Sequence, residues 1–168
     1  MVKSLRMVAE AVTVVTGGAS GIGLGLAIHA AQHGHRRVAV VDLDDSPLGD
    51  AVEQVRRAGA EEAVGMDCDV SDREAVLGLP ARIAAALGQA ELHVGLLCAN
   101  AGVGPLVSGS GADSVLESTP RDWERMLGPN TMGLAWTFQA FVPSMVAGGS
   151  PARVLATCSC FSLFAGGG

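Results

Sequence analysis

The fold is decided by the stretch Thr16-Gly17-Gly18-Ala19-Ser20-Gly21-Ile22-Gly23, which joins two segments with different apolar patterns. The residues before it, Val12 to Val15, form a continuous β-branched run that is typical of a buried strand. The residues from Gly21 to His33 carry apolar side chains at helical spacing. The sequence therefore predicts a strand, a glycine-rich turn and a helix in direct succession.

Such a turn has a chemical use. Glycine lets the chain turn tightly and lets its backbone approach an anion closely. The helix that follows presents free N–H groups and a partial positive charge at its N-terminus. The stretch thus predicts a site for the pyrophosphate of a dinucleotide. The alternative interpretation is that the glycines only make a tight β–α turn.

The rest of the chain continues the same alternation. Further strands are expected at Val38 to Val41, Ala63 to Met66, Leu92 to Cys98 and Arg153 to Thr157. Further helices are expected from an N-cap at Ser46-Pro47 to about Ala58, from a capping box at Ser71-Asp72-Arg73-Glu74, and from Thr119-Pro120-Arg121-Asp122 to about Met145.

The resulting β-α-β-α-β-α-β-α-β order predicts the architecture. Strands that are apolar throughout and alternate with helices call for a parallel sheet covered on both faces. We expect an α/β fold of the Rossmann type, a doubly wound parallel sheet that stops after the fifth strand, in one incomplete domain over residues 1–168. Its last strand should leave an exposed apolar edge. The segment from Val103 to Ser118 should be a loop at the carboxyl edge of the sheet, where ligands bind.

Composition narrows the class of protein. With 49% hydrophobic and 17% charged residues the chain should be globular, and its net charge of −6 argues against nucleic acid as a partner. Phosphates would then be met by backbone N–H groups, because basic side chains are few. No apolar run is long enough to span a membrane. The N-terminus carries two positive charges, as a signal peptide would, but Glu10 interrupts the apolar run that follows, so a cytoplasmic protein is favoured.

Cysteine and histidine suggest no metal site. Cys68, Cys98, Cys158 and Cys160 form no Cys-x-x-Cys pair, and we interpret them as buried, reduced thiols in preference to zinc ligands. His33 and His35 flank Gly34 in an expected loop, so both should be solvated.

Asp42 closes the second predicted strand. A carboxylate there can accept hydrogen bonds from both ribose hydroxyls of the adenosine half of a dinucleotide. It would repel a 2′-phosphate, since two unit charges about 4 Å apart cost about 4 kcal/mol at an effective dielectric of 20. Asp42 therefore favours NAD over NADP. The alternative is an ordinary surface carboxylate.

Five short motifs in this order resemble the short-chain dehydrogenase/reductase family over nearly the whole chain. They are the Gly17–Gly23 turn, Asp69-Val70, Asn100-Ala101-Gly102, Trp123 through Asn130, and Cys158-Ser159-Cys160. The resemblance implies that NAD is held by Gly17, Ala19, Ser20, Gly21, Ile22, Gly23, Asp42, Leu43, Asp69, Val70, Asn100, Ala101 and Gly102. It further implies catalytic roles for Ser159, which would orient the substrate oxygen, and for Asn130, which would join a proton relay.

The chain also departs from that pattern. It contains no Tyr, and Lys3 is its only lysine, so the family's Tyr-x-x-x-Lys is missing. A general acid or base typically contributes about 10²–10⁴-fold, so the 168-residue chain alone should be inactive. Pro129 lies inside a predicted helix, where it should bend the helix. The bend could suit Asn130 or displace it.

Three interpretations of function follow. The first is a fragment of an NAD-dependent oxidoreductase that transfers hydride between NAD and a small-molecule alcohol or carbonyl substrate. The second is a non-catalytic NAD-binding module or redox sensor, and a truncated product without stable function is the third. The resemblance also suggests a homo-oligomer.

Overall fold

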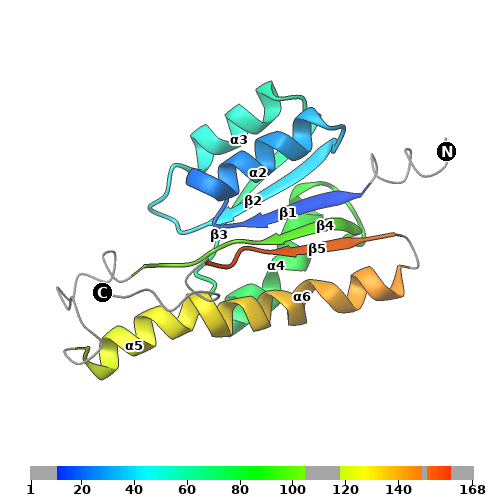
Figure 1. Ribbon diagram of the computed structural model, residues 1–168. Helices are drawn as coiled ribbons and strands as arrows, with labels where there is room; N and C mark the ends of the chain where they lie inside the picture. Colours follow the sequence, from blue (N-terminus) through cyan, green and yellow to red (C-terminus); the bar gives the residue numbers. More distant parts are fainter. Residues whose placement is uncertain (1–10, 105–117, 149–150, 160–168) are drawn as a thin grey trace.

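A computed structural model of the chain describes residues 11–104, 118–148 and 151–159 (Figure 1). Its centre is a five-stranded parallel sheet in the order β3-β2-β1-β4-β5. The strands are β1 (Val12–Thr16), β2 (Arg37–Asp42), β3 (Glu62–Asp67), β4 (Val94–Ala99) and β5 (Arg153–Ala156). The helices are α2 (Gly21–Gln32), α3 (Leu48–Arg57), α4 (Arg73–Ala86), α5 (Pro120–Leu127) and α6 (Leu134–Ala147), with a π-helical segment η1 (Gly128–Gly133) between the last two.

Helices cover both faces of the sheet. Figure 1 shows α2 and α3 on one face and α4, α5 and α6 on the other. Successive strand residues point to opposite faces. In β1, Val12 and Val14 accordingly join the core beneath α4 and α6, whereas Val15 joins the core beneath α2 and α3. This two-sided burial explains the continuous apolar strands and confirms the predicted doubly wound fold.

The strand order reverses at β1. Thr16 at its end pairs with Val41 of β2 on one side and with Ala99 of β4 on the other. The connections after β1 and β4 therefore diverge to opposite faces and leave a crevice at the carboxyl ends of the strands, which is where such folds bind ligands. Within the described part of the chain β5 forms the sheet's edge, and its Val154 and Leu155 are 45% and 40% exposed.

One predicted helix start is confirmed and two are wrong. The Thr119 hydroxyl accepts a hydrogen bond from the Asp122 backbone N–H at 3.3 Å, and the Asp122 carboxylate accepts one from the Thr119 N–H at 2.9 Å, which makes a capping box. Before α4 the N-cap is Asp72 and not Ser71, because the Asp72 carboxylate accepts from the N–H groups of Glu74 and Ala75 at 3.0 and 3.2 Å.

Ser46 is not an N-cap either. Its hydroxyl donates to the Leu43 carbonyl at 2.6 Å and so is used within the preceding turn, while α3 begins at Leu48. The fourth strand begins at Val94, two positions later than predicted, although Leu92 is buried against the same core.

The segment around Pro129 departs from α-helical geometry. The helix predicted from Thr119 to Met145 consists of α5, η1 and α6, which follow one another as one long rod (Figure 1). Proline lacks the N–H that α-helical bonding requires, and the wider π-helical turn, with Pro at its start, accommodates that loss. The side-chain amide of Asn130 is hydrogen-bonded at both ends to Val103, and its part in a proton relay stays a prediction.

Candidate nucleotide-binding site

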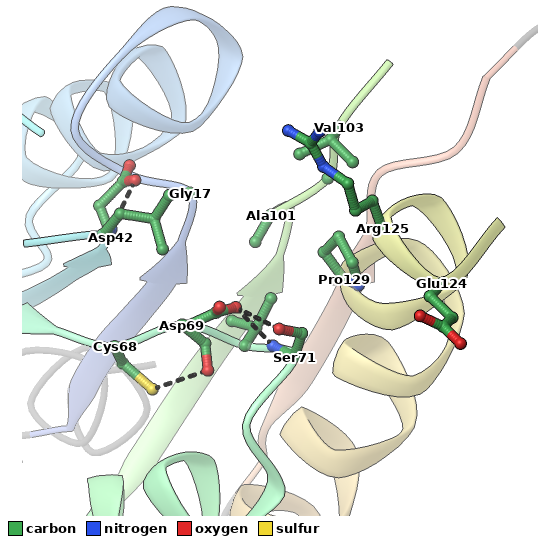
Figure 2. A pocket seen from close by; sticks show the side chains of 13 residues that line it. Gly17, Asp42, Cys68, Asp69, Ser71, Ala101, Val103, Glu124, Arg125 and Pro129 are labelled. Carbon is green, nitrogen blue, oxygen red and sulfur yellow. Dashed lines mark hydrogen bonds between the residues drawn. The ribbon is translucent and has the colours of Figure 1, made fainter. Parts of the chain in front are cut away.

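A cavity of about 370 Å³ opens at the carboxyl ends of β1, β2 and β4, beside α5 (Figure 2). It is lined by Gly17, Asp42, Leu43, Cys68, Asp69, Val70, Ser71, Ala101, Gly102, Val103, Glu124, Arg125 and Pro129. The walls come from the ends of four strands or the loops after them, and from the junction of α5 with η1. The cavity thus occupies the crevice that the strand order creates.

The glycines of the first turn have different tasks. Gly17 has a φ of +62°, and a Cβ there would lie 2.8 Å from the Cα of Ala101. A Cβ on Gly23 would lie 1.9 Å from the Gly17 carbonyl oxygen, so this glycine lets α2 pack against the turn. Gly21 has a φ of +50° and open space around its Cβ position. The close contact of Gly23 is therefore with the chain itself.

Asp42 bridges β2 and the glycine turn. One carboxylate oxygen accepts a hydrogen bond from the Ala19 N–H at 2.8 Å, and the other accepts one from the Leu43 N–H at 2.8 Å. Each carboxylate oxygen has two lone pairs, so each retains the capacity to accept a second hydrogen bond. The half-buried carboxylate is thereby fixed in place and still able to receive two hydroxyl groups at the cavity edge.

Asp69 forms another part of the cavity wall. Its Oδ1 accepts hydrogen bonds from the Ser71 N–H at 2.8 Å and from the Ser71 hydroxyl at 2.7 Å (Figure 2). The neighbouring Cys68 is buried, and desolvation raises the pKa of its thiol to about 11. At neutral pH this cysteine is protonated and poorly nucleophilic.

Asn100 ties the turn to the middle of the sheet. Its side-chain amide donates to the Gly17 carbonyl at 3.1 Å, and its side-chain oxygen accepts from the Thr157 hydroxyl at 2.8 Å. The buried Thr16 hydroxyl accepts from the backbone N–H groups of Asn100 and Ala101 at 3.1 and 3.2 Å. The ends of β1, β4 and β5 are thus held together by one network.

Asn130 performs a similar task on the opposite wall. Its Oδ1 accepts from the Val103 N–H at 2.8 Å, and its Nδ2 donates to the Val103 carbonyl at 2.9 Å. A Cβ on Gly102 would lie 2.8 Å from the same Oδ1. The side chain therefore fixes the loop after β4 against η1.

The structure brings together part of the predicted site. Of the residues expected to hold the cofactor, those that line the cavity are Gly17, Asp42, Leu43, Asp69, Val70, Ala101 and Gly102. Ala19, Gly23 and Asn100 support its walls through the contacts given above. Ser20 is the exposed N-cap of α2, and Ile22 is 68% exposed. Ser159, which follows β5, is exposed and does not line the cavity.

Several wall residues were missed by sequence reasoning. They are Cys68, Ser71, Val103, Glu124, Arg125 and Pro129. The last three come from a helix that is distant in sequence from the glycine turn, and helical periodicity does not reveal which face meets a cavity. Pro129 was noticed only as a helix breaker.

The cysteine and histidine predictions are partly wrong. Cys68 and Cys98 are buried free thiols as expected, but Cys158 is exposed because it follows the uncovered edge strand, and Cys160 lies outside the described residues. His33 is exposed as expected. His35 is half-buried, with its Nδ1 2.7 Å from the hydroxyl oxygen of the fully buried Thr13, and burial lowers its pKa.

Within residues 11–104, 118–148 and 151–159, no three His, Cys, Asp or Glu side chains are grouped so that they could hold a metal ion. No helix in the described ranges has the length and apolarity needed to cross a membrane.

The strand order, the glycine turn and the crevice define a protein of the Rossmann fold class. The sequence model of the short chain dehydrogenase family matches residues 11–167. The chain therefore belongs to that family.

Two relatives illustrate the likeness. The chain is 31% identical over 150 residues to C alpha-dehydrogenase of a Sphingobium species, covering 89% of this chain and 46% of the relative. It is 32% identical over 157 residues to 1-deoxy-11-beta-hydroxypentalenate dehydrogenase of Streptomyces avermitilis, covering 92% and 54%. The chain thus spans about half the length of the curated relatives it matches.

Solved structures agree with the fold. A short chain dehydrogenase/reductase from Burkholderia phymatum, solved in complex with NAD, is 33% identical and superimposes with a TM-score of 0.79. The match covers 93% of this chain and 51% of that one.

Proposed function

We propose that this chain binds NAD and belongs to an oxidoreductase that transfers hydride between NAD and a small-molecule alcohol or carbonyl compound. The observation that carries the cofactor assignment is the Asp42 carboxylate, held at the cavity edge by two backbone N–H groups with acceptor capacity to spare. Such a group suits the two free hydroxyls of an adenosine ribose and opposes a 2′-phosphate. A similar structure that was solved with NAD also supports the proposal.

Residues on the cavity walls and in the glycine turn beside the cavity fit the parts of this cofactor. Gly21 leaves open space at the N-terminus of α2, where the helix can receive a pyrophosphate. Asp69 and Val70 offer a hydrogen-bond acceptor and an apolar surface to the adenine base. Ala101 and Gly102 bring a backbone without large side chains to the middle of the cavity. Bound NAD would supply the hydride acceptor.

The catalytic roles rest on the family likeness. We assign Ser159 to orienting the substrate oxygen. Asn130 is hydrogen-bonded to Val103 through both polar atoms of its side chain, which positions the loop that borders the cavity. Its second N–H and the second lone pair of its oxygen would serve the proton relay.

A second candidate function is NAD binding without catalysis. The two candidates differ in turnover and agree on binding.

Calorimetric titration with NAD and with NADP tests the shared part of both candidates. The expected result is saturable binding of NAD and weaker binding of NADP. Equal affinities, or tighter binding of NADP, would contradict the role of Asp42. This chain by itself is expected to show no turnover under either candidate. Turnover of NAD with a panel of secondary alcohols therefore separates the candidates when it is measured on the product of the complete gene, because an NAD-binding module shows none.

We also propose self-association through α5. Trp123 and Leu127 lie one helical turn apart and are 42% and 48% exposed, which makes an apolar strip on the helix. Analytical ultracentrifugation of the wild type and of Trp123→Ser should show a loss of dimers in the variant. A monomeric wild type would contradict this.

We further propose a cytoplasmic location, consistent with the free thiols of Cys68 and Cys98, and cell fractionation tests it.

A further inference from the structure

Arg125 lines the nucleotide cavity from the side opposite to Asp42. In Figure 2 its side chain extends from α5 toward Val103, whereas the neighbouring Glu124 projects away from this direction. Arg125 and Pro129 are four positions apart and both face the cavity, because residues at this spacing share one side of a helix.

The helix that carries Arg125 is held at both of its ends. The capping box at Thr119 fixes the start of α5, and the two hydrogen bonds from Asn130 to Val103 fix its junction with η1 against the loop after β4. The backbone that carries Arg125 is therefore anchored at both ends. Among the described residues, no hydrogen bond or ion pair involves the Arg125 guanidinium.

The charges around the cavity are uneven. Its ionisable carboxylates come from Asp42, Asp69 and Glu124, and Arg125 supplies its one cation among the described residues. Asp42 and Asp69 lie where the β2 and β3 strands end, and Arg125 lies on the helix wall across from them (Figure 2). A ligand with hydrogen-bond donors at one end and anionic groups further along matches this distribution.

We propose that Arg125 is a cofactor-binding residue whose guanidinium pairs with the pyrophosphate of the dinucleotide. A guanidinium presents several N–H donors in a plane and matches phosphate oxygens well. Gly17, in the turn before α2, lines the same cavity, so the guanidinium would approach the phosphates from the wall that faces this turn. This inference rests on the proposed NAD-binding function and adds a basic side chain to a site whose phosphates were expected to rely on backbone groups alone.

The competing role for Arg125 is stacking on the adenine base, which would contribute a cation–π contact. The two roles differ in their response to salt. A pair between an exposed guanidinium and a phosphate is screened as ionic strength rises, since the Debye length falls from about 10 Å at 0.1 M to about 3 Å at 1 M. A stacking contact changes much less.

The test compares Arg125→Gln with the wild type by calorimetric titration of NAD and of ADP-ribose, which keeps the pyrophosphate and lacks the nicotinamide. At about 0.1 M salt the variant should bind both ligands about three- to tenfold more weakly, and at about 1 M salt the difference should shrink to less than twofold. The control is Arg57→Gln on α3, which removes the same charge away from the cavity and should leave both affinities unchanged.

The outcomes distinguish an error in the role of Arg125 from an error in the proposed NAD binding. If the wild type binds NAD and Arg125→Gln binds it equally well, the assignment of Arg125 is wrong and the proposed function stands. A loss that persists at high salt also overturns the pairing with phosphate and points to stacking. If the wild type binds neither ligand, the proposed function itself fails. Unchanged melting temperatures without ligand would exclude misfolding as the cause of a loss.

Discussion

Gly23 and Gly25 lie two positions apart in α2, and replacing each by Ala should have opposite effects on stability. A Cβ at position 23 would lie 1.9 Å from the Gly17 carbonyl oxygen and 2.6 Å from the Asn100 amide nitrogen. The first neighbour is backbone, so the helix or the turn must shift. Overpacking of this severity costs about 3 kcal/mol, and loss of the bond from Asn100 to Gly17 costs about 1 kcal/mol more.

The gain from helix propensity offsets part of this cost. Ala in place of Gly in a helix stabilises it by about 1 kcal/mol, so Gly23→Ala should lower the free energy of unfolding by about 3 kcal/mol. Gly25 has no atom within 4 Å of its Cβ position, and Gly25→Ala should raise that free energy by about 1 kcal/mol.

Thermal or urea denaturation measures both changes. For a chain of this size 1 kcal/mol corresponds to about 3 °C, so the melting temperatures should move by about −9 and +3 °C. The reasoning is refuted if Gly23→Ala is as stable as the wild type, because the contact with Gly17 would then be compressible.

Three further predictions test the site and the sheet. Asp42→Asn should weaken NAD binding about tenfold, because charge-assisted hydrogen bonds to the ribose are lost, and it should reduce the preference for NAD over NADP. Calorimetry with both cofactors checks this, and an unchanged ratio of the two dissociation constants would contradict it. Burial lowers the pKa of His35, so the folded state disfavours protonation of this side chain. The resulting stability is fully present above about pH 6.5 and is lost as the pH falls through the folded pKa. The midpoints of urea denaturation at about pH 8 and pH 5 should therefore differ less in His35→Gln than in the wild type. Asn100→Ala removes hydrogen bonds with the Gly17 carbonyl and the Thr157 hydroxyl and should lower the free energy of unfolding by about 2 kcal/mol. Urea denaturation measures this change, and a nearly unchanged free energy would contradict the prediction.

The strands were the most predictable part of the fold. Val12, Val14 and Val15 are all buried because helices cover both faces of the sheet, and that same burial produces a continuous apolar run in the sequence. The glycine turn was equally predictable, because a positive φ at Gly17 and at Gly21 favours glycine.

Helix starts were harder to predict because neighbouring polar residues compete for the same backbone groups. Ser71 and Asp72 are both good N-caps, and the choice depended on Asp69, whose carboxylate takes the Ser71 N–H and hydroxyl. Such a competition is decided by the direction of the preceding loop, and residue preferences alone do not encode that direction.

The helix wall of the cavity shows a second limit of prediction from sequence. Pro129 contradicts the helical pattern around it, and sequence rules could only flag the conflict. In the structure the chain adopts π-helical geometry at this point, and the next residue, Asn130, binds both backbone groups of Val103 on the cavity wall. Conflicts between local propensity and the overall pattern are expected at functional sites. The proline that breaks the helix rule therefore indicates where α5 must meet the nucleotide cavity, and Arg125 faces that cavity one turn before it.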